Sequence, residues 1–227
     1  MLREKRGQLV IFGVSNMLSD VFDCALANGL TLGKVIIHLP EVAGDRGRTL
    51  ADRLVALKGL CKPPTVQLLD DFVPCADHEL YLLGPTTPTR AELAAEVKHR
   101  FNLVFHTMVH PSAYVSPLAN LGEGVFIGAR SVIGSGADLS EHVFVNRGVT
   151  IGHDTRIGAF SRIQAGSNIG GLSHLGIGVT VALGSTLIER LVVGDHAFIA
   201  GGAVVISDVE ANTLVAGVPA VFKKLLS

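Results

Sequence analysis

A histidine and an aspartate stand side by side in the segment IGHDTRIG, residues 151–158, and no other pair in the chain is better suited to chemistry. Imidazole has an ordinary pKa of about 6.5, so at neutral pH it accepts a proton from an attacking amine or hydroxyl. A carboxylate nearby can orient the ring and raise its basicity. Neighbouring side chains diverge in extended chain, so such a pair requires a bend. We therefore take His153 as a candidate general base and Asp154 as its partner.

A solvated surface histidine is the alternative interpretation of His153, and the residue type alone leaves it open. The nearby histidines His142, His174 and His196 are separated from His153 and from each other by intervals of 11, 21 and 22 residues. A metal site needs several converging ligands, and these intervals supply no close pair. The sequence therefore predicts no metal site, and we interpret these three histidines as exposed residues.

The second half of the chain has a strict period of six. Sixteen aliphatic residues, here called the anchors, follow one another at every sixth position without an insertion. They are Val115, Leu121, Ile127, Ile133, Leu139, Val145, Ile151, Ile157, Ile163, Ile169, Leu175, Val181, Leu187, Val193, Ile199 and Val205. Four residues after each of the first fifteen anchors the side chain is Ala, Ser, Thr or Val, with Leu191 as the exception. Glycine follows the anchor in eight hexads, which suits a bend in the backbone.

A six-residue period predicts a parallel β-helix built from hexapeptides. With three hexads in each triangular turn, residues 18 apart stack, and sixteen hexads make a little over five coils. His153 is then the third residue of its hexad, at or near a corner where side chains face outward. Its stacking neighbours are Ser135 and Gly171, which are small and leave room beside the imidazole for a ligand.

Residues 8–109 alternate short apolar runs with helical patterns and end on the apolar run LVFHTMV. Strand and helix repeated in this way predict a small parallel sheet with covering helices. The first strand leads into the turn GVSN, which could bring a helix N-terminus to a phosphate. Because the turn lacks a full G-x-G-x-x-G, an ordinary strand-to-helix turn is equally compatible with it.

Composition narrows the function classes. The chain of 227 residues is 48% hydrophobic with a formal net charge of −1 and no long basic run, which argues against nucleic acid and an anionic membrane surface as partners. Cys24, Cys61 and Cys75 are odd in number without metal-like spacing, so we expect a reducing, cytoplasmic location. The basic start and the short apolar run after it lack a cleavage site of a signal peptide. No apolar stretch approaches the roughly 20 residues that span a bilayer.

Three segments together resemble one family. HPSAYVSPLANLGEGVFIG, VFVNRGVTIGHDTRIGAFSRI and DVEANTLVAGVPA are similar to the sugar O- and N-acyltransferases of the NeuD and PglD type. The resemblance implies a small Rossmann-like α/β domain that binds a nucleotide-sugar (1–109), a left-handed parallel β-helix (110–208) and a closing segment (209–227). It also implies a bacterial enzyme of surface glycan biosynthesis that uses acetyl-CoA. Such enzymes are homotrimers with the cofactor between neighbouring β-helices, and they act on nucleotide-linked sugars or sialic acids.

The resemblance assigns roles around the histidine. His153 matches the family's general base and Asp154 the acidic residue that follows it. Asn146 matches an asparagine that places the acceptor sugar. Gly171 matches a glycine whose N–H lies near the thioester carbonyl, where it can stabilise an oxyanion.

The segment AGVPA resembles the loop that closes beside the CoA tail. The resemblance therefore implies cofactor contacts from Ala216, Gly217 and Pro219. Lys223, with Lys224, could meet the CoA phosphates, although the family's lysine usually follows PA directly.

Three departures from the family concern substrate handling. Arg162 stands where better-known N-acetyltransferases have a second histidine near the acetyl group. The N-terminal turn reads GVSNML in place of a sequence similar to G-A-S-G-H-G, with Met17 at the histidine position. Pro40 and Glu41 replace the acidic pair after the second strand.

Because these positions handle the acceptor in the family, the expected acceptor contacts include Arg162 together with Gly13 and Ser15 of the turn. An arginine at position 162 could clamp a carboxylate or phosphate, or cap a corner.

The leading hypothesis is an acetyl-CoA-dependent sugar acyltransferase in which His153 activates the acceptor for direct attack on the thioester. A hexapeptide-repeat binding or scaffold trimer with weak catalysis is the alternative, supported by Arg162 and the altered turn. A serine or small-molecule acetyltransferase sharing the coil is disfavoured by the N-terminal α/β domain. The sequence leaves open which sugar is acylated, on nitrogen or oxygen, and with which acyl group.

Overall fold

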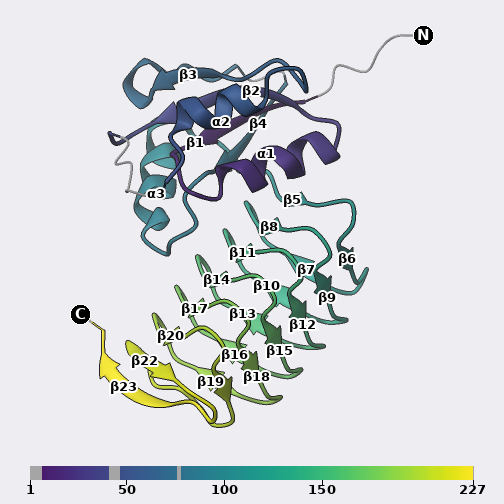
Figure 1. Ribbon diagram of the computed structural model, residues 1–227, viewed down its shortest axis with the longest axis vertical. Helices are drawn as coiled ribbons and strands as arrows, with labels where there is room; N and C mark the ends of the chain where they lie inside the picture. Colours follow the sequence, from purple (N-terminus) through teal and green to yellow (C-terminus); the bar gives the residue numbers. More distant parts are fainter. Residues whose placement is uncertain (1–6, 41–46, 76–77, 227) are drawn as a thin grey trace. The chain divides into compact units, whose positions relative to one another are not determined.

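The computed structural model describes residues 7–40, 47–75 and 78–226. The chain forms two compact units (Figure 1). The N-terminal unit consists of Met1–Thr86 with Arg90–His106, and the β-helix unit of Thr87–Thr89 with Thr107–Ser227.

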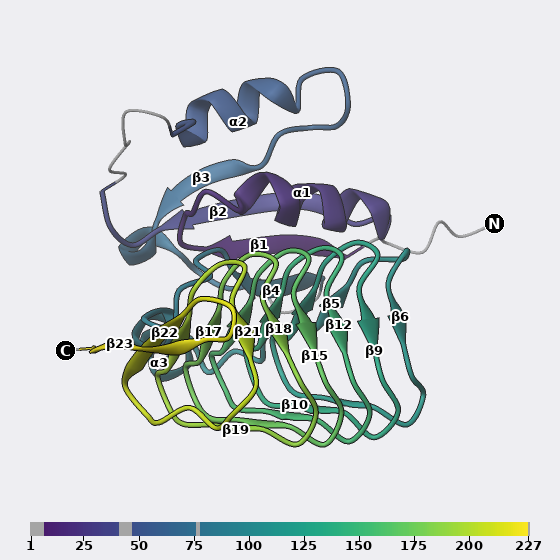
Figure 2. The same cartoon turned by 60° about the horizontal axis from the view of Figure 1, so that its bottom comes forward.

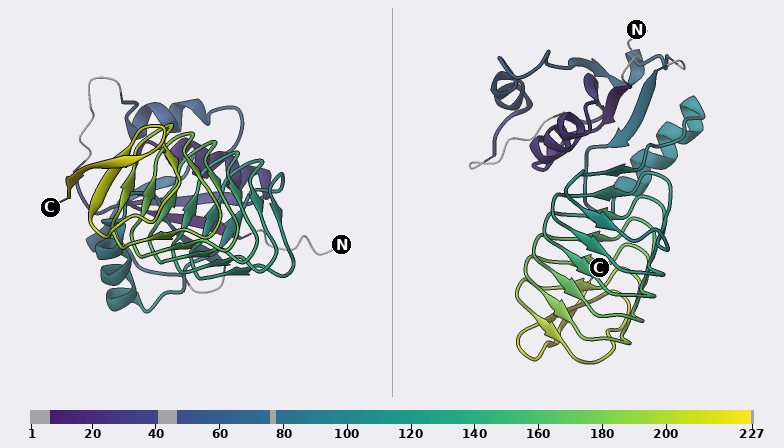
Figure 3. Two further views of the ribbon diagram at one scale, coloured as in Figure 1. Left: turned by 90° about the horizontal axis from the view of Figure 1, so that it is seen from below. Right: turned by 90° about the vertical axis from the view of Figure 1, so that its right-hand side faces the viewer.

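The N-terminal unit is a four-stranded parallel sheet in the order β3-β2-β1-β4. Helices α1 and α2 lie on one face of the sheet and α3 on the other (Figure 3). β1 is buried over four of its five residues, as expected of a parallel strand covered on both faces. The elements are β1 (Gln8–Phe12), α1 (Leu18–Ala27), β2 (Thr31–Ile37), α2 (Leu50–Ala56), β3 (Thr65–Leu68), the 3-10 turn η1 (Leu69–Asp71), β4 (Glu79–Leu83) and α3 (Arg90–Phe101).

The prediction that residues 103–109 form the last strand of this sheet is wrong. Phe105 pairs with Tyr81 in an isolated bridge outside the named strands, and Met108–Val109 forms β5, the first strand of the β-helix. The reason is that the six-residue period begins one step earlier than Val115. Val109 occupies that earlier anchor position, and Met108 pairs with Phe126, 18 residues later.

The β-helix unit consists of three sheets of stacked parallel strands, each two residues long except the last two, β22 and β23, of which β23 is antiparallel (Figures 1 and 2). The five-strand sheet contains β7 (Asn120–Leu121), β10 (Asp138–Leu139), β13 (Arg156–Ile157), β16 (His174–Leu175) and β19 (Val192–Val193). The six-strand sheet contains β6 (Tyr114–Val115), β9 (Val132–Ile133), β12 (Thr150–Ile151), β15 (Asn168–Ile169), β18 (Thr186–Leu187) and β21 (Val204–Val205).

The eight-strand sheet contains β5, β8 (Phe126–Ile127), β11 (Phe144–Val145), β14 (Arg162–Ile163), β17 (Thr180–Val181), β20 (Phe198–Ile199), β22 (Thr213–Ala216) and β23 (Val221–Leu225). Paired residues are 18 apart, as in Asp138 with Arg156 and Leu139 with Ile157. The sequence predicted an α/β sheet followed along the chain by a left-handed β-helix of hexapeptides, and this prediction is confirmed.

The anchors form one inward column and the residues four positions later form a second. Every anchor from Ile127 to Val205 is at most 3% exposed. In the second column the buried hydroxyls donate to carbonyl oxygens 15 residues on. Ser131 donates to Asn146, and Thr155 donates to Gly170. The small polar residues of the second column therefore have hydrogen-bond partners inside the β-helix, and these bonds join one coil to the next.

The sequence suggested that glycine follows the anchors because the backbone bends there, but the structure gives a different reason. Positive φ occurs at the third residue after the anchor, in every hexad from Gly124 to Gly202. Glycine next to the anchor has no positive φ; it is required because a Cβ there would strike the following coil. At Gly134, for example, that Cβ would lie 2.8 Å from the backbone nitrogen of His153. Close stacking of coils, and not the bend, therefore selects these glycines.

None of the helices in the described part of the chain is long and apolar enough to cross a membrane.

Val192 and Val193 test the conclusion that the anchors point into the interior of the β-helix. Val193 is 1% exposed and Val192 is 53% exposed. We expect Val193→Asp to lower the free energy of unfolding by more than about 3 kcal/mol, because it buries an unpaired charge. Val192→Asp should cost less than about 0.5 kcal/mol, as is usual at the surface. Denaturant unfolding measures both, and equal losses would contradict the assignment.

Candidate active site

His153 and Asp154 lie at the corner that joins β12 to β13, between the six-strand and five-strand sheets. Asp154 has a φ of 55°, a left-handed conformation that aspartate tolerates better than most residues. The bend turns the carboxylate back toward its neighbour, so that Oδ2 lies 2.8 Å from Nδ1 of the imidazole. The corner thus supplies the bend that the pair requires.

The hydrogen bond assigns the two ring nitrogens different tasks. A carboxylate can only accept, so in the neutral ring we place the proton on Nδ1 and the lone pair on Nε2. The side chains are 59% and 58% exposed, which leaves Nε2 open to a ligand. A neutral imidazole held in this tautomer can take a proton from a bound nucleophile.

Two glycines leave room for the pair. A Cβ on Gly171 would lie 2.7 Å from Nε2 of His153, so the ring lies directly against this residue. On the coil before, a Cβ on Gly136 would strike Oδ1 of Asp154. Gly136 was missed in the sequence, although it lies 18 residues before Asp154 and the same stacking rule finds it.

The backbone of Gly171 offers a donor beside the imidazole. Its carbonyl accepts from Arg190, and Leu172 donates to the carbonyl of His153. Within the described residues, no hydrogen bond uses the N–H of Gly171. A free N–H next to a candidate base is the arrangement that stabilises a developing oxyanion.

Toward the C-terminus this corner exposes two apolar side chains beside the charged residues Glu189 and Arg190. Leu172 is 41% exposed on the coil after His153, and Ile188 is 43% exposed one coil further. We call these two residues the apolar ledge. Toward the N-terminus the stacking neighbours are Ser135 and Gly136. A ligand at Nε2 therefore meets different surroundings on its two sides.

Asn146 lies at another corner, between β11 and β12, and is only 4% exposed. Its Nδ2 donates to Oε1 of Gln164 at 3.0 Å, and its Oδ1 accepts from the Arg147 N–H at 2.7 Å. Within one chain Asn146 and His153 stand at opposite ends of one edge of the coil. The structure of a single chain does not bring them together.

Arg162 lies on β14, in the eight-strand sheet, whose face is opposite the corner of His153. Its Nε donates to Oγ1 of Thr180 at 3.1 Å. Burial lowers the pKa of the guanidinium, and within the described residues no carboxylate pairs with it. One chain therefore does not place Arg162 beside His153 either.

The loop with Ala216, Gly217 and Pro219 connects β22 to the antiparallel β23. The Gly217 carbonyl accepts from Val204, and the Val204 carbonyl accepts from Ala220. These bonds fix the loop on the last coil. All of β23 is exposed, including Lys223.

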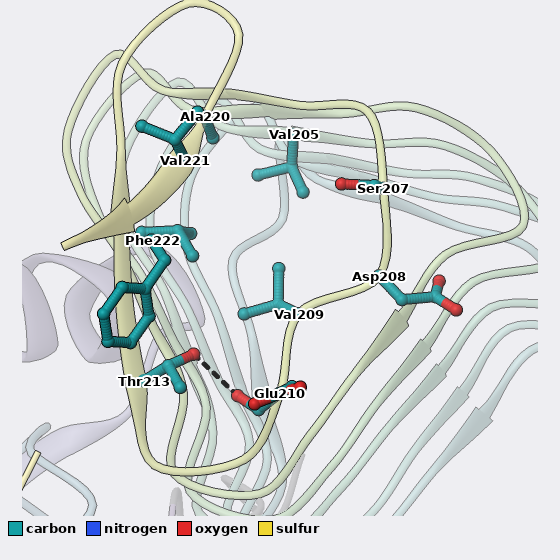
Figure 4. Close-up of a pocket in the computed structure, with 10 residues that line it drawn as sticks. Val205, Ser207, Asp208, Val209, Glu210, Thr213, Ala220, Val221 and Phe222 are labelled. Atoms are coloured by element: carbon teal, nitrogen blue, oxygen red, sulfur yellow. Dashed lines mark hydrogen bonds between the residues drawn. The ribbon is translucent and has the colours of Figure 1, made fainter. Parts of the chain in front are cut away.

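A pocket of about 460 Å³ lies beside this loop at the C-terminal end of the coil. Its lining includes Val205, Val209, Ala220 and Phe222, and Figure 4 shows them around it. It contains neither His153 nor Asp154, so it is separate from the candidate base.

In the N-terminal unit the turn after β1 is held by its own contacts. Gly13 has a φ of 80°, and a Cβ there would lie 2.8 Å from Pro85. The Ser15 hydroxyl donates to the Gly84 carbonyl at 2.7 Å and accepts from the Met17 N–H at 3.2 Å. Pro40 is exposed after β2, whereas Glu41 lies outside the described residues.

Among residues 7–40, 47–75 and 78–226, no three histidine, cysteine or acidic side chains are grouped so that they could hold a metal ion.

The chain was compared with known proteins. No protein-family model matches it, and no curated protein is similar to it in sequence. Among solved structures, the acetyltransferase domain of PglB from Neisseria gonorrhoeae with acetyl coenzyme A is 23% identical, with a TM-score of 0.79 over 96% of this chain and 100% of that chain. PerB from Caulobacter crescentus with CoA and GDP-perosamine is 25% identical, with a TM-score of 0.75 over 96% and 98%.

A variant of perosamine N-acetyltransferase from Caulobacter crescentus, also with CoA and GDP-perosamine, is 23% identical and has a TM-score of 0.79 over 96% and 97% of the two chains. The chain shares the fold of these acetyltransferases. The likeness covers the two units together, and the resemblance stated from the sequence is confirmed.

The contact between Gly171 and the imidazole can be tested directly. We expect Gly171→Ala to displace the ring of His153 and break its bond to Asp154, because the new Cβ would lie within 2.7 Å of Nε2. Gly201→Ala is the matched control at the same position of its hexad, where the nearest atom is Leu183 oxygen at 3.3 Å. NMR spectra of the ring nitrogens measure the change. Unaltered His153 resonances in Gly171→Ala would contradict the geometry.

Proposed function

We propose that this protein is an acetyl-CoA-dependent acyltransferase that acetylates an amino or hydroxyl group of a nucleotide-linked sugar in bacterial surface glycan biosynthesis, in the cytoplasm. The observation that carries the proposal is the paired imidazole with Nε2 held against Gly171. Base and oxyanion donor lie side by side there, as direct attack on a thioester requires.

In the proposed reaction, Nε2 of His153 takes the proton from the acceptor amine or hydroxyl as this group attacks the thioester carbonyl. The Gly171 N–H stabilises the charge that develops on the carbonyl oxygen. The C–S bond then breaks, and His153 returns the proton to the leaving thiolate. Asp154 keeps the proton on Nδ1 and stabilises the imidazolium formed midway.

We infer that the donor approaches over the apolar ledge. Leu172 and Ile188 expose apolar surface next to the reacting position, which suits the pantetheine arm of CoA. Ala216, Gly217 and Pro219 would close beside the CoA tail, and the exposed Lys223 would face its phosphates. CoA supplies the activated acetyl group, and these residues hold and orient it.

The acceptor contacts are proposed to come from more than one copy of the chain. Asn146 and Arg162 lie away from His153 in a single chain, so both can serve one site only if subunits share it. A homotrimer packed along the faces of the β-helix would do this. Gly13 and Ser15 would shape the turn that faces the nucleotide.

Replacing the base is the first test. We expect His153→Ala to lower turnover at least ~100-fold, as is typical for the loss of a general base, with acetyl-CoA affinity nearly unchanged. His174→Ala, an exposed histidine on β16, is the control and should keep full activity. Thiol release from acetyl-CoA with nucleotide-linked amino sugars measures both. Full activity in His153→Ala would refute the assigned role.

Binding of acetyl-CoA separates the transferase from the scaffold alternative. We expect calorimetry to detect binding by the wild type, loss of it in Gly171→Val because a branched side chain fills the space beside His153, and retention in Gly201→Val. If the wild type does not bind, the scaffold interpretation replaces the transferase.

A further inference from the structure

Arg53 in α2 is a buried cation. The residue is 8% exposed, its Nε is buried without a hydrogen-bond partner, and its Nη1 donates to Oγ of Ser19 at 2.6 Å. In the part of the chain that the structure describes, no carboxylate forms an ion pair with it. Its neighbour Asp52 is instead bonded to Thr49 at the start of α2. A buried charge left in this state is unfavourable.

Ser19 belongs to the first turn of α1, whose N-cap residue Met17 makes no capping hydrogen bond with its side chain. The N–H groups of Leu18 and Asp20 bond to carbonyls within the turn. The N–H of Ser19 makes no hydrogen bond with the described residues. A helix N-terminus carries partial positive charge, so Arg53 adds a second positive charge at an already positive end. Asp20 is the acidic residue of the same turn.

The chain itself covers part of the turn that leads from β1 into α1. Pro85 packs against Gly13, and the Ser15 hydroxyl is bonded to Gly84, so that part is occupied by the chain itself. Ser19 is exposed, and Arg53 reaches it from α2. A ligand that reaches the first turn of α1 through Ser19 therefore meets the guanidinium.

The geometry points to an anion site in which Ser19 and Arg53 bind the diphosphate of the acceptor. A guanidinium offers paired donors that match phosphate oxygens, and the free N–H of the first turn adds a third. An anion here would neutralise the charge of Arg53 and accept a hydrogen bond from the first turn of α1. This inference rests on the proposed function, because a nucleotide-linked sugar supplies the diphosphate. It assigns recognition to residues outside the GVSN turn.

Calorimetry on the full chain tests the site with inorganic pyrophosphate, GDP and UDP as probes. We expect Arg53→Gln to weaken binding of all three at least tenfold. Lys58→Gln, which removes the same charge from an exposed position just after α2, should change it less than twofold. Because CoA also carries a diphosphate, acetyl-CoA is titrated in parallel, and its affinity should stay the same in Arg53→Gln.

Three results would overturn the inference: no binding of any diphosphate by the wild type, unchanged binding in folded Arg53→Gln, or an equal loss of acetyl-CoA binding. A protein that binds acetyl-CoA but no diphosphate refutes this site alone. A protein that binds diphosphates but not acetyl-CoA refutes the proposed transferase and leaves the site standing.

Thermal unfolding separates a binding role from a structural one. Pyrophosphate should raise the Tm of the wild type and leave that of Arg53→Met unchanged, while Arg53→Met without anion should melt no lower than the wild type. The pyrophosphate shift decides: if it persists in Arg53→Met, the inference fails. Should Arg53→Met not fold, Arg53→Lys keeps the charge and should retain a reduced shift, and a full-sized shift in it would count against recognition by the guanidinium fork.

Discussion

The stacking of coils at an 18-residue register is the constraint on which the β-helix and its site depend. Strands joined by backbone hydrogen bonds lie only about 4.8 Å apart. Each side chain at a corner must therefore fit the residues 18 before and after it. Gly134, Gly152 and Gly170 meet this demand, because a Cβ on any of them would strike the next coil. The same rule, applied to His153 and Gly171, opens the space in which chemistry can take place.

A second consequence of stacking is the left-handed residue at each corner. Most sequences place glycine or asparagine there, yet this chain also accepts Leu172 and Arg190 with φ of 59° and 65°. Repeated hydrogen bonds between coils hold these residues in a conformation that they would not adopt alone. At Asp154 the same conformation turns a carboxylate toward the adjacent imidazole. The site is thus a variation on a corner that every coil repeats.

The two units contribute different kinds of recognition. The β-helix offers a rigid backbone and an exposed imidazole paired with a carboxylate at one corner. The N-terminal unit holds Arg53 as a buried cation beside the first turn of α1, and such a helix end favours an anion.

Much of the fold follows from the sequence alone, because a six-residue period of aliphatic residues is compatible with few structures other than a hexapeptide β-helix. The stacking of His153 on Gly171 follows from the same arithmetic. Tertiary structure decided that Asp154 bends back onto its neighbour, and that residues 108–109 join the coil. It also decided that Asn146 and Arg162 lie away from His153 in a single chain, and that Arg53 is buried without an ion pair among the described residues. The environments of Asn146, Arg162 and Arg53 depend on contacts between segments distant in sequence, which no local pattern encodes. The bend at Asp154 depends on the backbone conformation of its corner, and residues 108–109 continue the six-residue period one step toward the N-terminus.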